Sequence, residues 1–131
     1  MSTAHSEYNQ IDFDKAKEIG EMKGEIVLVS FPFTDLSAAK LRPALVIYEA
    51  EKDAIMAFIS SKVSPELSDV GISITKKQAG FRKTGLEVNS TTKLDKIATF
   101  LKDLVVGELG ELDEELREEE VNRKLRSVME I

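Results

Sequence analysis

The chain has 131 residues, a formal net charge of −6 and a composition that is 42% hydrophobic. A chain of this length fits one domain that can bury an adequate core without covalent or metal cross-links. It contains no cysteine, and its only histidine is His5 in a polar N-terminal segment. These counts exclude disulfides, thiolate metal sites and histidine-rich zinc or iron sites.

The sequence also bears on magnesium binding, on membrane association and on secretion. A carboxylate-only Mg²⁺ site stays open, because that ion needs only one or two carboxylates. No apolar run approaches the ~20 residues that a membrane-spanning helix needs. Residues 1–15 lack the basic and apolar regions of a signal peptide. We therefore expect a soluble cytoplasmic protein that has no membrane partner.

Acidic residues are concentrated near the two ends of the chain. Residues 1–23 carry a net charge of −2, residues 111–131 carry −4, and the middle is neutral. Within the middle, residues 76–83 hold four bases and no acid. Such a cluster permits a phosphate-binding face, although a single short basic run is more typical of a solvated loop.

The first half of the chain predicts three strands. Residues 1–23 are expected to be an N-terminal extension that either forms a short helix over 12–22 or is partly disordered, and residues 24–131 are expected to form the domain. Val- and Ile-rich runs predict strands at 24–31, 43–49 and 54–60, the last two joined as a hairpin. Pro32 should end the first strand or lie at its edge, residues 33–41 should form a loop, and Pro43 should open the second strand.

The second half predicts further short strands and one helix. The strands are expected at 70–75, 86–88, 91–94, 97–100 and 104–109. From residue 112 the apolar residues follow a helical spacing, with Asp113 as the N-cap and basic residues near the far end. Many short strands and a terminal amphipathic helix predict a mainly β fold, a small barrel or sandwich.

The residue types available restrict the chemistry. Without cysteine, and with one histidine in the N-terminal segment, the usual acyl-transfer triads cannot be built. No glycine-rich nucleotide loop is present. RNA cleavage by its own 2′-OH remains feasible, since it needs an acid, a base and donors around the phosphorus rather than a protein nucleophile.

Three places in the sequence, with five residues between them, could supply such groups. Arg42 precedes Pro43 and could direct a planar guanidinium at a phosphate from the rim of the sheet. Ser60 and Ser61 close the third strand, and Lys93 and Asp95 share one face of a later strand. Taken singly, each is better explained as a rim ion pair, a strand-end turn or a surface salt bridge.

Together, two blocks of sequence resemble the PemK/MazF-type toxins of type II toxin–antitoxin systems. The blocks are GEIVLVSFPFTDLSAAKLRPALVI at 24–47 and TTKLDKIATFLKDLVVGELGELDEE at 91–115. The resemblance covers about 24–128. It implies an SH3-like β-barrel with appended helices, a homodimer, and metal-independent cleavage of single-stranded RNA to a 2′,3′-cyclic phosphate and a 5′-OH. It also implies inhibition by a cognate antitoxin and no cofactor.

The resemblance assigns catalytic roles to Arg42, Ser60, Lys93 and Asp95. Asp95 would take the proton, Lys93 would donate one, and Arg42 and Ser60 would stabilise the charge, because a guanidinium is a poor base at neutral pH. The positions expected to bind RNA are Thr34, Asp35, Lys40, Ser61, Lys62 and Lys96. Ser60 stands where the family has Thr, and Lys93 stands where some relatives have Arg.

Two non-catalytic alternatives remain open. The related CcdB toxins share the barrel and poison DNA gyrase by protein contact alone. A degenerate relative could bind RNA or an antitoxin without cutting. Cleavage of RNA by the purified protein would separate the catalytic reading from both alternatives.

Overall fold

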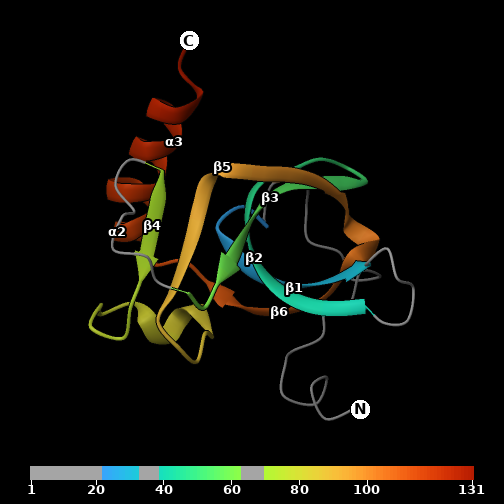
Figure 1. Cartoon of the computed structure of the whole chain (residues 1–131), viewed down its shortest axis with the longest axis horizontal. Helices are drawn as coiled ribbons and strands as arrows, with labels where there is room; N and C mark the ends of the chain where they lie inside the picture. The colour runs from blue at the N-terminus through green and yellow to red at the C-terminus, as the bar shows by residue number, and fades with distance from the viewer. Residues whose placement is uncertain (1–21, 33–38, 63–69) are drawn as a thin grey trace.

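The computed structural model describes residues 22–32, 39–62 and 70–131. Six antiparallel strands form one sheet in the order β4-β5-β3-β2-β1-β6. Figure 1 shows this sheet and a C-terminal helix that lies beside β4. The strands are β1 (Glu25–Pro32), β2 (Ala39–Glu49), β3 (Asp53–Ser60), β4 (Gly71–Ile74), β5 (Ser90–Leu101) and β6 (Val105–Glu111). The helix predicted at 12–22 falls almost wholly outside the described residues.

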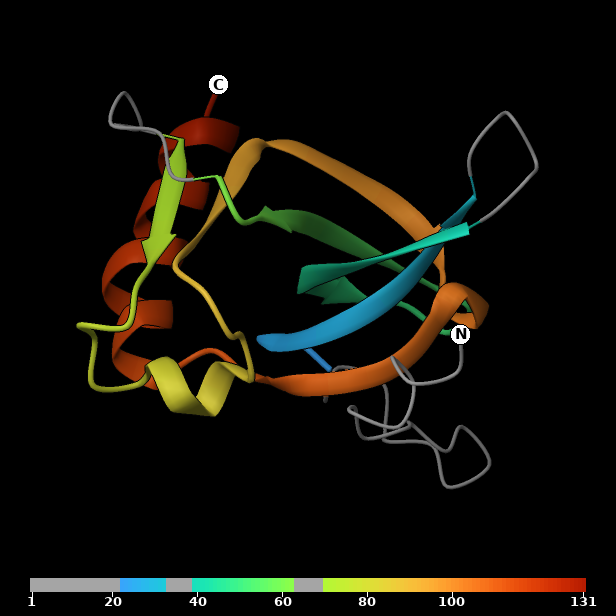
Figure 2. The same ribbon diagram turned by 60° about the horizontal axis from the view of Figure 1, so that its bottom comes forward.

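The sheet is strongly curved. Figure 2 shows β1, β2, β3, β5 and β6 curling around a common interior. In the described part of the chain the pairing runs from β4 to β6 and does not join these two edges. The expected mainly β class is therefore confirmed, as a curved sheet that stays open between β4 and β6.

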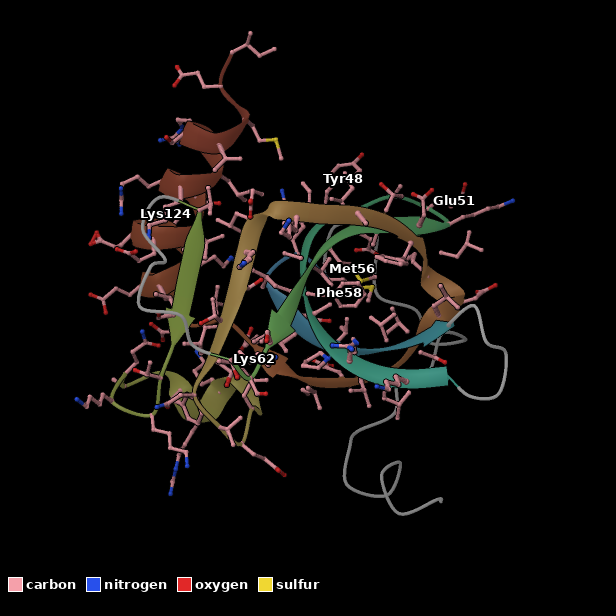
Figure 3. The ribbon with its side chains drawn as sticks, viewed as in Figure 1. Tyr48, Glu51, Met56, Phe58, Lys62 and Lys124 are labelled. Atoms are coloured by element: carbon pink, nitrogen blue, oxygen red, sulfur yellow. The ribbon has the colours of Figure 1, made fainter. Side chains whose placement is uncertain are left out.

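Each face of the sheet packs into its own core. Val27, Val29 and Met56 belong to the inner core, and Figure 3 shows Met56 and Phe58 on the inside of the curve. Ile26 and Leu45 face the opposite way, into the helix-side core. β1 is paired on both edges and buried on both faces, which explains why its sequence is a continuous apolar run.

The C-terminal helix covers the helix-side core. It comprises α2 (Glu114–Leu116), the π-type turn η4 (Arg117–Val121) and α3 (Asn122–Met129). The Asp113 carboxylate accepts a hydrogen bond from the Glu115 N–H at 3.2 Å, so the predicted N-cap is confirmed. Val121 is buried, and Leu116 and Leu125 pack against the same core.

Several predicted boundaries are wrong. β2 begins at Ala39, so residues 39–41 are strand and Pro43 lies inside it. Proline is tolerated there because the pairing of β2 with β3 begins only at Ala44, so β2 has one neighbouring strand at Pro43. Residues 86–88 are not a strand, and the segments predicted at 91–94 and 97–100 are the two halves of β5.

β5 is one strand because a bulge carries it around a bend. Ile59 of β3 pairs with Thr92, whereas Ala57 pairs with Ile97, so residues 93–96 lie opposite Phe58 alone. The Thr92 hydroxyl lies 3.0 Å from the Phe58 carbonyl oxygen and 3.4 Å from that of Ala57. The side chain thus supplies a hydrogen bond where the regular ladder is interrupted.

A buried ion pair ties together segments that are distant in sequence. Lys102, in the 3₁₀ turn η3 (Lys102–Leu104), lies 2.6 Å from the Glu49 carboxylate. Glu49 also accepts a hydrogen bond from the Met22 N–H at 3.0 Å, and the Lys102 ammonium donates to the Ala50 carbonyl at 2.9 Å. These contacts fix the start of the described chain against the β2–β3 turn.

Candidate RNA-binding cleft

A cleft of about 740 Å³ opens beside β2 and the end of β3. Its lining residues come mainly from β2, from residues 59–62 and from the segment 85–90. Its apolar lining comes from Leu28, Leu41, Pro43, Ile59, Leu86, Val88 and Leu109. Its polar lining comes from Lys40, Arg42, Ser60, Ser61, Lys62, Glu87 and Ser90.

Arg42 and Lys40 lie two residues apart on β2, so both project to the same side of the strand. Both are exposed, and their backbone is held by the ladder with β1, where Arg42 pairs with Val29. The β2–β3 pairing starts at Ala44. Residues 39–43 of β2 are therefore not paired with β3, and residues 40–43 line the cleft.

Ser60 ends β3 and faces Thr91 of β5 in the ladder. Its side-chain oxygen accepts a hydrogen bond from the Lys62 N–H at 3.1 Å. That bond orients the hydroxyl while leaving its own hydrogen for another acceptor. Ser61 and Lys62 follow directly and line the same cleft, and all three residues are exposed.

The segment 85–90 is held at both of its ends. Gly85 has a φ of +75°, and a Cβ there would collide with the Leu109 carbonyl oxygen, so only glycine fits this close approach to β6. The Leu86 N–H donates to the Thr84 hydroxyl at 3.1 Å, and the Ser90 hydroxyl donates to the Val88 carbonyl at 2.8 Å. These contacts fix the conformation of the segment where it lines the cleft.

The charge of the cleft is opposite in sign to that of the chain. Lys40, Arg42 and Lys62 line it, with Glu87 as the single carboxylate among its described lining residues. The whole chain carries −6. A lining that combines positive charge with apolar side chains suits a ligand that has both phosphates and flat rings, such as a single-stranded nucleic acid.

Lys93, Asp95 and Lys96 do not line this cleft. Lys93 lies on β5, two residues beyond Thr91, and pairs with Gly71 of β4. The side chains of Lys93, Asp95 and Lys96 are all exposed within the bulge at 93–96. Two residues of strand span about 7 Å. The structure therefore brings Lys40, Arg42, Ser60, Ser61 and Lys62 together and leaves the predicted acid–base pair beside them.

Other predicted positions have different outcomes. Thr34 and Asp35 lie outside the described residues. The basic run at 76–83 does not line the cleft; part of it forms a smaller cavity of about 330 Å³ against the C-terminal helix. The sequence reasoning missed Glu87, Val88 and Ser90, because residues 86–88 were predicted as a strand. Gly85 could have indicated a turn at this point of the sequence.

The described residues contain neither a metal-binding cluster nor a membrane-spanning helix. No group of three or more His, Cys, Asp or Glu side chains within the described ranges could hold a metal ion. None of the helices in these ranges has the length and apolarity needed to cross a membrane.

Comparison with protein families identifies residues 22–129 as matching PemK-like, MazF-like toxins of type II toxin–antitoxin systems. The match covers most of the chain and includes the described residues that line the cleft. No curated protein matches the chain in sequence.

Solved structures with similar folds agree with this match. An endoribonuclease in complex with its cognate antitoxin, from a mycobacterial species, aligns with a TM-score of 0.61 at 13% identity, covering 82% of this chain and 93% of its own. A mycobacterial endoribonuclease aligns at 0.60 and 12%, covering 82% and 89%. The Mycobacterium tuberculosis toxin MazF-mt6 aligns at 0.59 and 17%, covering 82% and 97%. At these identities the likeness concerns the fold.

Proposed function

Because the chain belongs to the family of PemK-like, MazF-like toxins of type II toxin–antitoxin systems, we propose that it is an endoribonuclease that cuts single-stranded RNA in the cleft. The observation that carries the proposal is the meeting of Arg42 and Ser60 in one cleft, with Lys40 and Lys62 beside them. Two structurally similar mycobacterial proteins are endoribonucleases, which favours the same activity here.

The proposed reaction needs no protein nucleophile. The RNA 2′-oxygen loses its proton and attacks the adjacent phosphorus, and the bond from phosphorus to the 5′-oxygen breaks. The products are a 2′,3′-cyclic phosphate and a 5′-OH, the latter formed when the leaving oxygen takes up a proton. The step is proposed to proceed without a metal ion.

Arg42 and Ser60 have the chemistry to stabilise the charge that gathers on the phosphate. The guanidinium offers a planar set of N–H donors to the non-bridging oxygens. The Ser60 hydroxyl already accepts a hydrogen bond from the Lys62 N–H, so its hydrogen is available to a phosphate oxygen. Donors fixed in place before reaction are the most effective form of this stabilisation.

The proton transfers are a separate part of the proposal. We assign proton abstraction to Asp95 and proton donation to Lys93, which requires the RNA to run from Ser60 past Thr91 toward the β5 bulge. The bulge supports this assignment because bulges redirect side chains and are frequent beside active sites. The ladder position of Lys93 is within about a side chain's length of Thr91.

The proposed partners follow from the family. A cognate antitoxin would inhibit the enzyme by occupying the cleft, where Lys40, Arg42 and Lys62 would attract an acidic segment. One of the similar structures is itself a complex with its cognate antitoxin. We further propose a homodimer acting in the cytoplasm, where messenger RNA is available.

The direct test is RNA cleavage in the presence of EDTA. Purified protein is incubated with mixed-sequence RNA, and the new ends are mapped and their chemistry identified. The wild type should leave 2′,3′-cyclic phosphate and 5′-OH ends. Arg42→Ala should cut on the order of 10²- to 10³-fold more slowly, because it removes a donor to the developing charge.

The matched control is Arg126→Ala, which removes an exposed guanidinium on α3 that does not line the cleft. This variant should cut at the wild-type rate. No cleavage by the wild type, or equal rates for wild type and Arg42→Ala, would reject the proposed activity.

A further inference from the structure

The segments that line the cleft differ in chemistry. Among the described lining residues, the cations Lys40, Arg42 and Lys62 come from β2 or from the end of β3. The segment 85–90 contains no lysine or arginine and contributes Glu87 and Val88 instead. A single RNA strand is divided in a similar way, because its phosphates lie along one edge and its bases along the other.

This match orients a bound strand. Phosphates lie against the cations of β2 and the end of β3, which turns the bases toward the segment 85–90. Val88 is 49% exposed, so it offers apolar surface to a base. Glu87 is also exposed and lies next to Val88. A carboxylate repels phosphate and accepts hydrogen bonds, so with the bases turned toward it, its ligand is a hydrogen-bond donor on a base edge.

The segment is rigid enough to discriminate between bases. Gly85 is packed against the backbone of β6, and the Ser90 and Thr84 hydroxyls fix the chain on either side of residue 87. In addition, the Asn89 side chain accepts a hydrogen bond from the Lys76 N–H at 2.7 Å. A recognition group on a pre-organised support loses little entropy when it binds.

We propose that Glu87 determines sequence specificity by binding guanine, an inference that rests on the proposed function because it requires RNA to occupy the cleft. In single-stranded RNA the Watson–Crick edges are open to reading. Guanine presents two adjacent donors on that edge, N1–H and the N2 amino group, which fit the two oxygens of a carboxylate. Adenine and cytosine present one amino donor beside an acceptor, and uracil presents one N–H between two acceptors.

Base recognition can be measured apart from cleavage. A pool of randomised 2′-fluoro RNA hexamers lacks the 2′-OH and cannot be cut, so the bound fraction can be recovered and sequenced. Wild type should enrich guanine at one position. Glu87→Gln and Glu87→Ala should lower that preference by about tenfold to a hundredfold, the range for losing one bidentate base contact.

Two controls sharpen the readout. Glu51→Gln removes an exposed charge in the β2–β3 turn, at the opposite end of β3 from Lys62, as Figure 3 shows, and should leave the base profile unchanged. Inosine in place of the enriched guanine deletes only the N2 amino group. It should weaken binding to the wild type and have no effect on binding to Glu87→Ala.

The outcomes separate the inference from the proposed function. Guanine enrichment that depends on Glu87, in a protein that cuts no RNA, supports the inference and rejects the activity. Cleavage with a base profile that Glu87→Ala does not alter rejects the inference and leaves the activity standing. A preference for another base, no base preference in the wild type, or a uniform loss of cleavage rate with an unchanged profile would also overturn the assignment to guanine reading.

Discussion

Arg42 lies where β2 has β1 as its one neighbouring strand, and Pro43 follows because no ladder N–H toward β3 is needed there. From a family resemblance, we predicted that Arg42, Ser60 and the Lys93–Asp95 pair, which are far apart in the chain, would share one site. The structure brings Arg42 and Ser60 into one cleft, whereas Lys93 and Asp95 do not line it. It also adds Glu87 and Val88, which carry no sequence signature because two residues in a bend show no periodicity.

At the residue scale, the proton-transfer assignment predicts the behaviour of Asp95→Ala. With saturating RNA, this variant should have a kcat lower by about 10²- to 10⁴-fold, since it removes the proposed base. Binding of uncleavable RNA should be unaffected. Asp103→Ala, which removes an exposed carboxylate in the turn η3, outside the bulge, serves as the control for kcat. Equal kcat values for Asp95→Ala and the parent would remove Asp95 from the mechanism.

At the element scale, β5 shows what local pattern cannot reveal. The sequence suggested two strands at 91–94 and 97–100, because the alternation of apolar and polar residues is interrupted between them. In the structure the same interruption is a bulge within a single strand that pairs with β3 on both sides of the bend and with β4 before it. Strand ends that depend on pairing partners are set by tertiary context.

The bend predicts opposite effects for two neighbouring threonines. Both side chains are buried, but the Thr92 hydroxyl bonds to backbone carbonyls, whereas the Thr91 hydroxyl has no hydrogen-bond partner among the described residues. Thr92→Val should lower the free energy of unfolding by about 1 to 3 kcal/mol, because a buried carbonyl loses its donor. Thr91→Val should be neutral or stabilising, because it removes an unsatisfied group.

Urea unfolding monitored by circular dichroism checks this pair. Each variant replaces one hydroxyl by a methyl group at adjacent buried positions, so each controls for the change in the other. Similar losses of stability in the two variants would contradict the role assigned to Thr92 at the bulge.

At the scale of the whole molecule, the fold class was predictable because the apolar runs and the C-terminal helical spacing are both strong. β1 reads as a buried strand since both of its faces are covered, and the helix begins at the predicted cap. The curvature that leaves the sheet open between β4 and β6 was not predictable, because it depends on the register shifts along β1, β2, β3 and β5.

The net charge of the chain indicates a binding partner only when the positions of the charges in the structure are known. A chain of −6 argues against a nucleic-acid partner when taken as a whole. The acids are concentrated toward the chain ends, and those at the C-terminal end are mostly on the helix. Among the described residues that line the cleft, three are cations and one is an acid. The charge that matters for RNA is therefore the local one.

The most direct measurement is a crystal structure of the protein bound to an uncleavable 2′-fluoro RNA. The account predicts one phosphate within hydrogen-bonding distance of both the Arg42 guanidinium and the Ser60 hydroxyl, with the bases turned toward residues 85–90. RNA bound on another surface, or in the cleft with its phosphates against Glu87, would contradict it.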